Sequence, residues 1–202
     1  MLDVVVKNTE RFLLSVPKTK RKKYGQFFTN MSTAKFMASL FCFDRSKPCL
    51  EILDAGAGTG ILATAVIQKL IDDGYKGRIH VTCYETDDFV MPVLEENMRL
   101  STVLPNVTCS IKTDNYITSQ NFSNYTLFGG EDFHYDYIIG NPPYLKTPKD
   151  AIEALAMPEV CYGAPNLYFL FWAMGIHNLK EGQELVYIIP RSWTSGAYFK
   201  RF

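Results

Sequence analysis

The sequence predicts an α/β protein with a mostly parallel sheet, and three observations lead to this fold class. Short apolar runs alternate along the chain with segments of helical periodicity. A glycine-rich stretch joins the first apolar run to a helix-like segment. An acidic residue directly follows the second apolar run. Because this alternation implies right-handed crossovers between parallel strands, we expect the strand order 3-2-1-4-5.

An N-terminal helical segment, residues 1–45, precedes the first strand. Within it, residues 35–43 have the apolar spacing of a helix that packs on a core. Residues 46–202 contain all the predicted strands. The chain has 202 residues, of which 47% are hydrophobic, and this is enough for a single α/β core.

The first strand, residues 50–53, is followed by the glycine-rich residues 54–60 and by a helix over residues 61–70. The glycine spacing, D-x-G-x-G-x-G, differs from the dinucleotide pattern G-x-G-x-x-G. Its first member, Asp54, stands at the strand end where a pyrophosphate would otherwise lie. A carboxylate there repels phosphate and favours an ammonium or sulfonium ligand.

The second strand, residues 80–84, is followed by Glu85, which is placed to accept hydrogen bonds from both hydroxyls of a ribose. Glu85 lies beyond the usual spacing of roughly twenty residues after the glycine loop, so Asp87 is the alternative ribose acid. A helix over residues 87–100 and a third strand over residues 107–111 come next.

The fourth strand, residues 137–140, leads into the tetrapeptide Asn-Pro-Pro-Tyr at residues 141–144. The two prolines supply no N–H donors and make the turn stiff. The side-chain carbonyl of Asn141 and the peptide carbonyl of Pro142 can accept hydrogen bonds, and Tyr144 offers an aromatic face. Together they would clasp a planar NH₂ group. Taken alone, the tetrapeptide is equally typical of an ordinary strand-ending turn.

The rest of the chain completes the alternation. We expect residues 118–135 to form a long polar loop before the fourth strand, and residues 146–164 to form an irregular stretch after the Asn-Pro-Pro-Tyr turn. Residues 166–179 and 184–190 follow, and the family resemblance described next implies that they form a helix and a strand. The aromatic residues within 168–172 have helical spacing, which favours a place in the core over base stacking.

These residues resemble the S-adenosylmethionine-dependent amino methyltransferases, specifically the adenine-N6 DNA methyltransferases of bacterial restriction-modification systems. Tyr-Gly-Gln-Phe-Phe-Thr at residues 24–29 resembles their N-terminal motif, which lies over the methionine end of the cofactor. Residues 113–116 resemble the motif whose acid accepts from the adenine amino group of the cofactor. The motif order matches one permutation class. The resemblance implies a Rossmann-like class I methyltransferase fold with S-adenosylmethionine as cofactor.

The resemblance also implies roles for individual residues. Asn141, Pro142 and Tyr144 would act in catalysis on an adenine flipped out of DNA, by direct methyl transfer without a metal. The residues expected to bind the cofactor are Gln26, Phe28, Thr29, Asp54, Ala55, Gly56, Gly58, Gly60, Glu85, Thr86, Asp114, Asn115, Asn141 and Pro143.

The chain departs from the family pattern in two respects. Asp114 is followed by Asn115 rather than by an aromatic residue. In the family, a hairpin that completes the sheet and a target-recognition domain follow, whereas this chain ends at Phe202, in a helix that begins near Ser195. We therefore expect a truncated core that does not methylate specific DNA sites alone and that works with a restriction or specificity subunit or domain.

Three other functions stay open. An Asn-Pro-Pro-Tyr turn also serves enzymes that methylate a glutamine amide of release factors, and related turns serve ribosomal RNA methyltransferases. The Gly-Gln-Phe-Phe-Thr segment favours DNA, because the glutamine enzymes carry a separate N-terminal helical domain. The third possibility, from a different class, is a non-catalytic, cofactor-binding subunit or remnant.

Composition adds limited information. The 21 basic and 21 acidic residues balance, which does not indicate a nucleic-acid binder, although basic residues cluster over residues 18–23. That cluster is either a solvated charge run or a contact with DNA phosphates. The five cysteines show no metal-binding spacing and are typical of reduced thiols in a cytoplasmic protein. Because of this cysteine spacing, we expect no metal as partner. No signal peptide or apolar run of membrane length occurs, so we expect no membrane as partner.

Overall fold

The computed structural model describes residues 1–17, 28–120, 135–161 and 165–191 of the chain. In these residues, five strands form one sheet in the order β3-β2-β1-β4-β5, and all neighbouring strands are parallel. This confirms the predicted fold class and strand order. The strands are β1 (Cys49–Ala55), β2 (Arg78–Tyr84), β3 (Val107–Lys112), β4 (Tyr135–Gly140) and β5 (Leu179–Tyr187).

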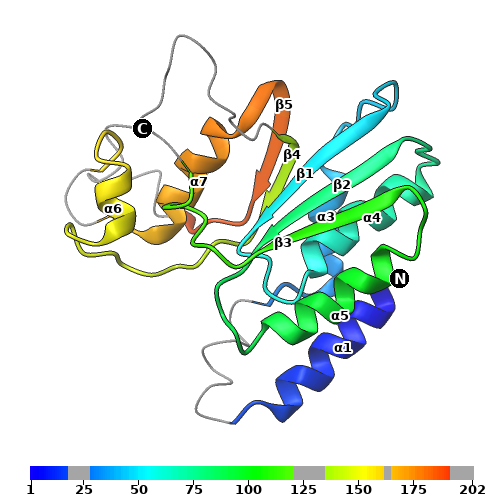
Figure 1. The fold of residues 1–202 in the computed structure, drawn as a ribbon, viewed down its shortest axis with the longest axis horizontal. Coiled ribbons are helices and arrows are strands. Elements are labelled where there is room, and N and C mark those ends of the chain that lie inside the picture. Colours follow the sequence, from blue (N-terminus) through cyan, green and yellow to red (C-terminus); the bar gives the residue numbers. More distant parts are fainter. Residues whose placement is uncertain (18–27, 121–134, 162–164, 192–202) are drawn as a thin grey trace.

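Helices cover both faces of the sheet. They are α1 (Leu2–Ser15), α3 (Met31–Ser39), α4 (Ile61–Asp72), α5 (Met91–Ser101), α6 (Ile152–Ala156) and α7 (Leu167–His177). Helices α1, α3, α4 and α5 lie on one side, and α7 lies on the other beside the short α6 (Figure 1). The interior strand β4, between β1 and β5, is buried along its whole length, as expected for a parallel sheet covered on both faces.

The aromatic residues of α7 lie in the core, as predicted. Tyr168, Phe169 and Phe171 are buried in the apolar cluster between α7 and the sheet. This helix is apolar around its whole circumference because it lies between the sheet and the segment that carries α6.

The bounds predicted for the helix in the N-terminal segment, residues 35 and 43, are both wrong, because α3 spans Met31–Ser39. The side chain of Asn30 accepts from the N–H of Thr33 at 2.9 Å, so α3 begins at Met31. The helix ends at Ser39, and the two phenylalanines that follow pack against Tyr137 of β4. Their apolar spacing therefore reports a contact with the sheet rather than a continuing helix.

Two other boundaries differ from the prediction. Residues 87–90 form a turn, and α5 begins at Met91, because Pro92 needs no N–H partner in the first turn of a helix. Strand β5 begins at Leu179 and includes Gly182 with a φ of 74°. The helix expected near Ser195 and most of the polar loop over residues 118–135 lie outside the described residues. The domain boundary at residues 45 and 46 stays a prediction.

The amino-terminal edge of the sheet is held by a buried carboxylate. Asp136 of β4 accepts from Lys47 Nζ at 2.7 Å, from Lys180 Nζ at 3.1 Å and from the N–H of Glu51 at 2.8 Å. Burial raises the pKa of Asp136, but the three donors outweigh burial and hold this pKa below its usual value. The bonds fix β4 beside β1, and the carboxyl ends of the strands are thereby aligned at the opposite edge.

Replacing Asp136 by alanine should lower the free energy of unfolding by about 2 kcal/mol, because three donors lose their acceptor. The two lysines are partly exposed, which keeps the loss below that of a fully buried pair. Since folding lowers this pKa, the stabilisation should be complete above about pH 4 and disappear as the pH falls through the lowered value. Urea unfolding measures both effects.

The matched control is Asp73→Ala. Asp73 forms partly exposed ion pairs with Lys69, one helical turn away, and with Arg45, so its loss should cost only about 1 kcal/mol. Equal losses for the two variants would contradict the role assigned to Asp136.

Candidate functional site

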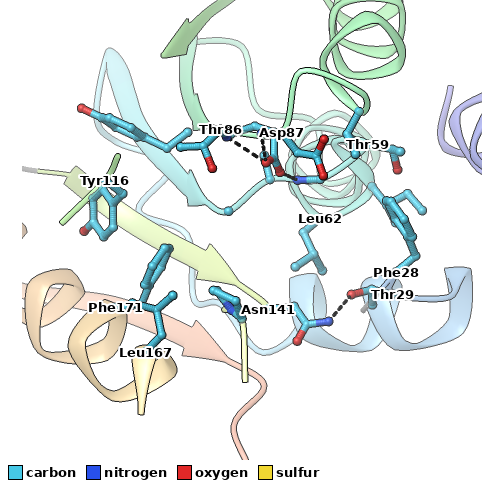
Figure 2. Close-up of a pocket in the computed structure, with 18 of the residues that line it drawn as sticks. Phe28, Thr29, Thr59, Leu62, Thr86, Asp87, Tyr116, Asn141, Leu167 and Phe171 are labelled. Atoms are coloured by element: carbon cyan, nitrogen blue, oxygen red, sulfur yellow. Dashed lines mark hydrogen bonds between the residues drawn. The ribbon is translucent and has the colours of Figure 1, made fainter. Parts of the chain in front are cut away.

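A pocket of about 340 Å³ opens at the carboxyl ends of the parallel strands (Figure 2). Its walls come from the segments that follow β1, β2, β3 and β4, from residues 28 and 29, and from the first turns of α7. Nine of the lining residues were predicted as site residues: Phe28, Thr29, Gly56, Gly58, Glu85, Thr86, Asp114, Asn141 and Pro143. The structure therefore brings together segments that are far apart in the sequence.

The glycine loop needs its glycines for backbone conformation. Gly56, Gly58 and Gly60 have φ angles of 72°, 55° and 79°, a region that other residues rarely adopt. Space is also short, because a Cβ at Gly60 would lie 2.6 Å from the side chain of Met98. A Cβ at Gly58 would lie 3.3 Å from the ring of Phe28. The loop is thus a tight turn with one surface open to the pocket.

Glu85 joins the glycine loop to the end of β2. Its Oε2 accepts from the N–H of Gly58 at 2.9 Å, and its Oε1 accepts from the N–H groups of Thr86 and Asp87 at 2.8 and 2.9 Å. A carboxylate has about four acceptor positions, so three bonds leave room for one ligand hydroxyl. Asp87 also lines the pocket and remains the alternative ribose acid.

Asp54 lies beneath the loop and is fully buried. Its Oδ2 accepts from the N–H of Ala63 at 2.9 Å, whereas its Oδ1 has no hydrogen-bond partner among the described residues. Burial raises the pKa of Asp54 to about 7, more than the Ala63 bond lowers it, and the charge of Glu85 raises it further. A buried carboxylate that lacks one partner suits a cationic ligand nearby.

The Asn-Pro-Pro-Tyr turn presents Asn141 to the pocket. Asn141 Nδ2 donates to Thr29 Oγ1 at 3.2 Å, and the two side chains face each other in Figure 2. Asn141 Oδ1 accepts from the hydroxyl of Tyr144 at 2.6 Å, and the same hydroxyl lies 2.9 Å from the carbonyl of Ile188. Burial raises the pKa of Tyr144, so this phenol keeps its proton and acts as a donor.

Other predicted site residues do not reach the lining. The ring of Tyr144 packs edge-on against Tyr168, with centroids 6.0 Å apart. Asn115 donates to Glu153 of α6 at 2.8 Å and accepts from the N–H of Ile117, so it supports the loop after β3. Those behind the lining are Asp54, Ala55, Gly60, Asn115, Pro142 and Tyr144. Gln26 and the basic residues 18–23 lie outside the described residues.

An aromatic row at one end of the pocket was not predicted. The ring of Tyr116 lies 5.2 Å from that of Tyr84 and 5.4 Å from that of Phe171. The sequence held a signal for two of them, because Tyr84 directly precedes Glu85 and Tyr116 lies two residues after Asp114. Phe171 is both a core residue and a wall of the pocket. The further lining residues are Ala57, Thr59, Ile61, Leu62, Val90, Leu145 and Leu167.

The described residues show no sign of a metal site or a membrane span. Within the described ranges, no group of three histidine, cysteine, aspartate or glutamate side chains is arranged to hold a metal ion. No helix in those ranges has both the length and the apolar character required to cross a membrane. The five cysteines form no disulfide.

Comparison with known proteins extends these observations. The model of the family described as Eco57I restriction-modification methylase matches residues 29–202. The type II methyltransferase M.BsuBI of Bacillus subtilis is 31% identical over an alignment of 203 positions, which covers 98% of this chain and 40% of that protein. M.PstI of Providencia stuartii is 34% identical, over 93% of this chain and 37% of that protein. The chain thus spans about two fifths of the length of these relatives.

The fold has solved counterparts. A class I S-adenosylmethionine-dependent methyltransferase from Listeria monocytogenes superposes with a TM-score of 0.67 at 21% identity, over 97% of this chain and 56% of that one.

A second kind of sequence relative also matches. A release factor glutamine methyltransferase of Fusobacterium nucleatum is 32% identical over 67% of this chain and 32% of that protein. The family match is longer and includes every strand of the sheet, so the chain belongs to the Eco57I restriction-modification methylase family.

Proposed function

We propose that this chain forms the cofactor-binding and catalytic part of a DNA methyltransferase that modifies the exocyclic amine of adenine. One observation carries the proposal. Asn141 of the Asn-Pro-Pro-Tyr turn lines the same pocket as the glycine loop and Glu85. A methyl donor and an amine must meet at one place, and this pocket offers binding groups for both.

The residues present fit S-adenosylmethionine. The pocket lies within the usual size range of ligand sites, about 300 to 1,000 Å³. The row of aromatic rings near Asp114 suits a planar adenine, and Glu85 or Asp87 suits ribose hydroxyls. The buried Asp54 beneath the loop suits the cationic methionine end. When bound, the cofactor supplies a methyl group activated by a sulfonium.

The chain's own task is to orient the acceptor amine. The lone pair of an adenine amine is delocalised into the ring, so the nitrogen is a poor nucleophile. Asn141 Oδ1 and the carbonyl of Pro142 would accept its two N–H protons and leave the lone pair directed at the methyl group. The hydroxyl of Tyr144 already donates to Asn141 Oδ1, and a carbonyl oxygen can accept a second hydrogen bond.

In duplex DNA the exocyclic amine of adenine is base-paired and inaccessible, so the adenine must flip out of the base stack before it can react. We infer that the ring of Tyr144 then turns from its contact with Tyr168 to stack on the flipped base. Sequence selection would come from a specificity domain or subunit, since the proposed roles of the described residues concern the cofactor and the reacting amine.

A release factor glutamine is the competing substrate, and the Fusobacterium relative favours it. Its side-chain amide offers the same planar NH₂ to Asn141 and Pro142. Incubating the complete protein with methyl-labelled S-adenosylmethionine and DNA, RNA or release factor should place the label on N6 of adenine. Label on glutamine or RNA would replace the proposal, and cofactor binding without transfer to any of them would indicate a non-catalytic subunit.

Glu85→Ala should weaken S-adenosylmethionine binding by about 1 to 3 kcal/mol, the cost of losing hydrogen bonds to a charged group. Asp87→Asn is the matched comparison and should change the affinity little. Isothermal titration calorimetry measures both variants, with circular dichroism to verify that they fold. The opposite ranking would assign the ribose to Asp87, and no change in either would remove both acids from the cofactor site.

Asp54 should make cofactor binding depend on pH. Its folded-state pKa, about 7, exceeds the unfolded value of about 4, so the free protein should lose stability as the pH rises from 4 to 7. A bound cation favours the ionised carboxylate, so affinity should rise by up to about tenfold from pH 6 to pH 8, in proportion to the ionised fraction of a group with a pKa of about 7. Asp54→Asn should flatten both profiles in urea unfolding and calorimetry. A variant that keeps the wild-type profiles would show that another group titrates.

Asn141→Ala in the complete enzyme should keep cofactor affinity and lower turnover at least a hundredfold, roughly the cost of losing a group that acts in the transition state. Tyr144→Phe removes only the hydroxyl and should reduce kcat less than Tyr144→Ala, which also removes the stacking ring. Single-turnover kinetics with a DNA substrate separates these effects from binding. Equal loss of cofactor affinity and turnover in Asn141→Ala would make the turn merely structural.

A further inference from the structure

Helix α1 lies outside the residues that match the family model, yet it contacts the lining of the pocket at two places. We propose that Thr9 and Phe12 of α1 are positioning residues for the cofactor, which act through the glycine loop and through Phe28. The inference rests on the proposed function of the pocket. It assigns part of the cofactor site to a segment that the family match does not include.

The first contact is a pair of buried hydroxyls. Thr9 Oγ1 lies 2.7 Å from Oγ1 of Thr59, and both residues are nearly inaccessible to solvent, with 3% and 1% of their surface exposed. Thr9 Oγ1 also bonds the carbonyl of Val5 at 2.9 Å. Removing the Thr9 hydroxyl would leave Thr59 without this partner in a buried place, which costs more than the bond itself contributes.

The same loop residue is held at its backbone. Asn97 of α5 donates from Nδ2 to the carbonyl of Thr59 at 2.8 Å. Its Oδ1 accepts from Nδ2 of Asn8, again on α1, at 2.9 Å. Thr59 stands between two glycines with positive φ, so its bonds fix the conformation of a segment that would otherwise be free to change. A hydrogen-bond network that is largely buried, as this one is, favours one geometry.

The second contact is aromatic. The ring of Phe12 lies 6.2 Å from the ring of Phe28 in an edge-to-face arrangement and 5.3 Å from the ring of Phe89. Phe28 lines the pocket and lies against Gly58. Thr9 and Phe12 are three residues apart, so they project from one side of α1. One helical face therefore supports both the loop and the ring packed against it.

A purely structural role predicts a different result from a positioning role. If α1 only adds core packing, any change at Thr9 should lower stability and leave affinity unchanged in the folded protein. If Thr9 positions the loop, an isosteric change that removes the hydroxyl should lower affinity, and a residue that restores the hydroxyl should recover it. The variants Thr9→Val and Thr9→Ser make this comparison.

The test is calorimetric titration of S-adenosylmethionine into the complete protein, with urea unfolding of each variant without cofactor. Thr9→Val should weaken binding about three- to tenfold, the range expected for one buried hydrogen bond, and Thr9→Ser should stay within twofold of wild type. Thr102→Val is the control for the chemical change itself, because its exposed hydroxyl also bonds a backbone carbonyl, that of Arg99, at the carboxyl end of α5. It should not change affinity.

Phe12→Leu tests the second contact, and leucine leaves a smaller cavity than alanine would. This variant keeps the inference testable if Thr9→Val does not fold. It should also weaken binding about threefold or more, by analogy with other aromatic pairs. Unchanged affinity in both Thr9→Val and Phe12→Leu, or equal loss in Thr9→Val and Thr9→Ser, would overturn the inference alone. No binding by the wild type would overturn the proposed function and this inference together.

Discussion

The site depends on the hydrogen bonds of the Glu85 carboxylate. This carboxylate accepts hydrogen bonds from three backbone N–H groups, one of which belongs to the glycine loop that follows β1. This is possible only because β1 and β2 are parallel neighbours in register, with Ala55 opposite Tyr84, so both strands end at the same level. Burial of Asp54 beneath the same loop would be costly without a charged partner, and a cationic ligand would provide one.

The fold could be predicted because its signals are local. Alternating apolar runs, the glycine spacing and an acid after the second strand need no knowledge of distant contacts. Element ends were less predictable, since Phe41 and Phe43 continue the helical apolar pattern that begins at residue 35 but pack on Tyr137 of β4, more than ninety positions away. Tertiary packing decided the end of that helix, and no window of neighbouring residues contains this information.

The site also contains residues that could be predicted from local sequence and residues that could not. Glu85 and Asn141 stand at strand ends, and their place in the pocket followed from the strand order alone. Tyr144 and Asn115 were expected at the lining but are not part of it. Asn115 bonds Glu153, and Tyr144 bonds the lining residue Asn141 and lies near the carbonyl of Ile188, contacts that the sequence alone does not reveal. Residues of α1 and the aromatic row depend on how helices pack on the sheet, so they became visible only in three dimensions.

The strand order also has a consequence for synthesis of the chain on the ribosome. Strand β1 is made early, but its second neighbour β4 pairs with it only after roughly 85 more residues, as Ile52 and Tyr137 show, a delay of roughly 4 to 17 s at ordinary translation rates. During that interval one edge of an apolar strand has no hydrogen-bonded neighbour. Helix α4 covers a face of the nascent sheet but not this edge, so the edge stays open to strand pairing with other chains until β4 is made.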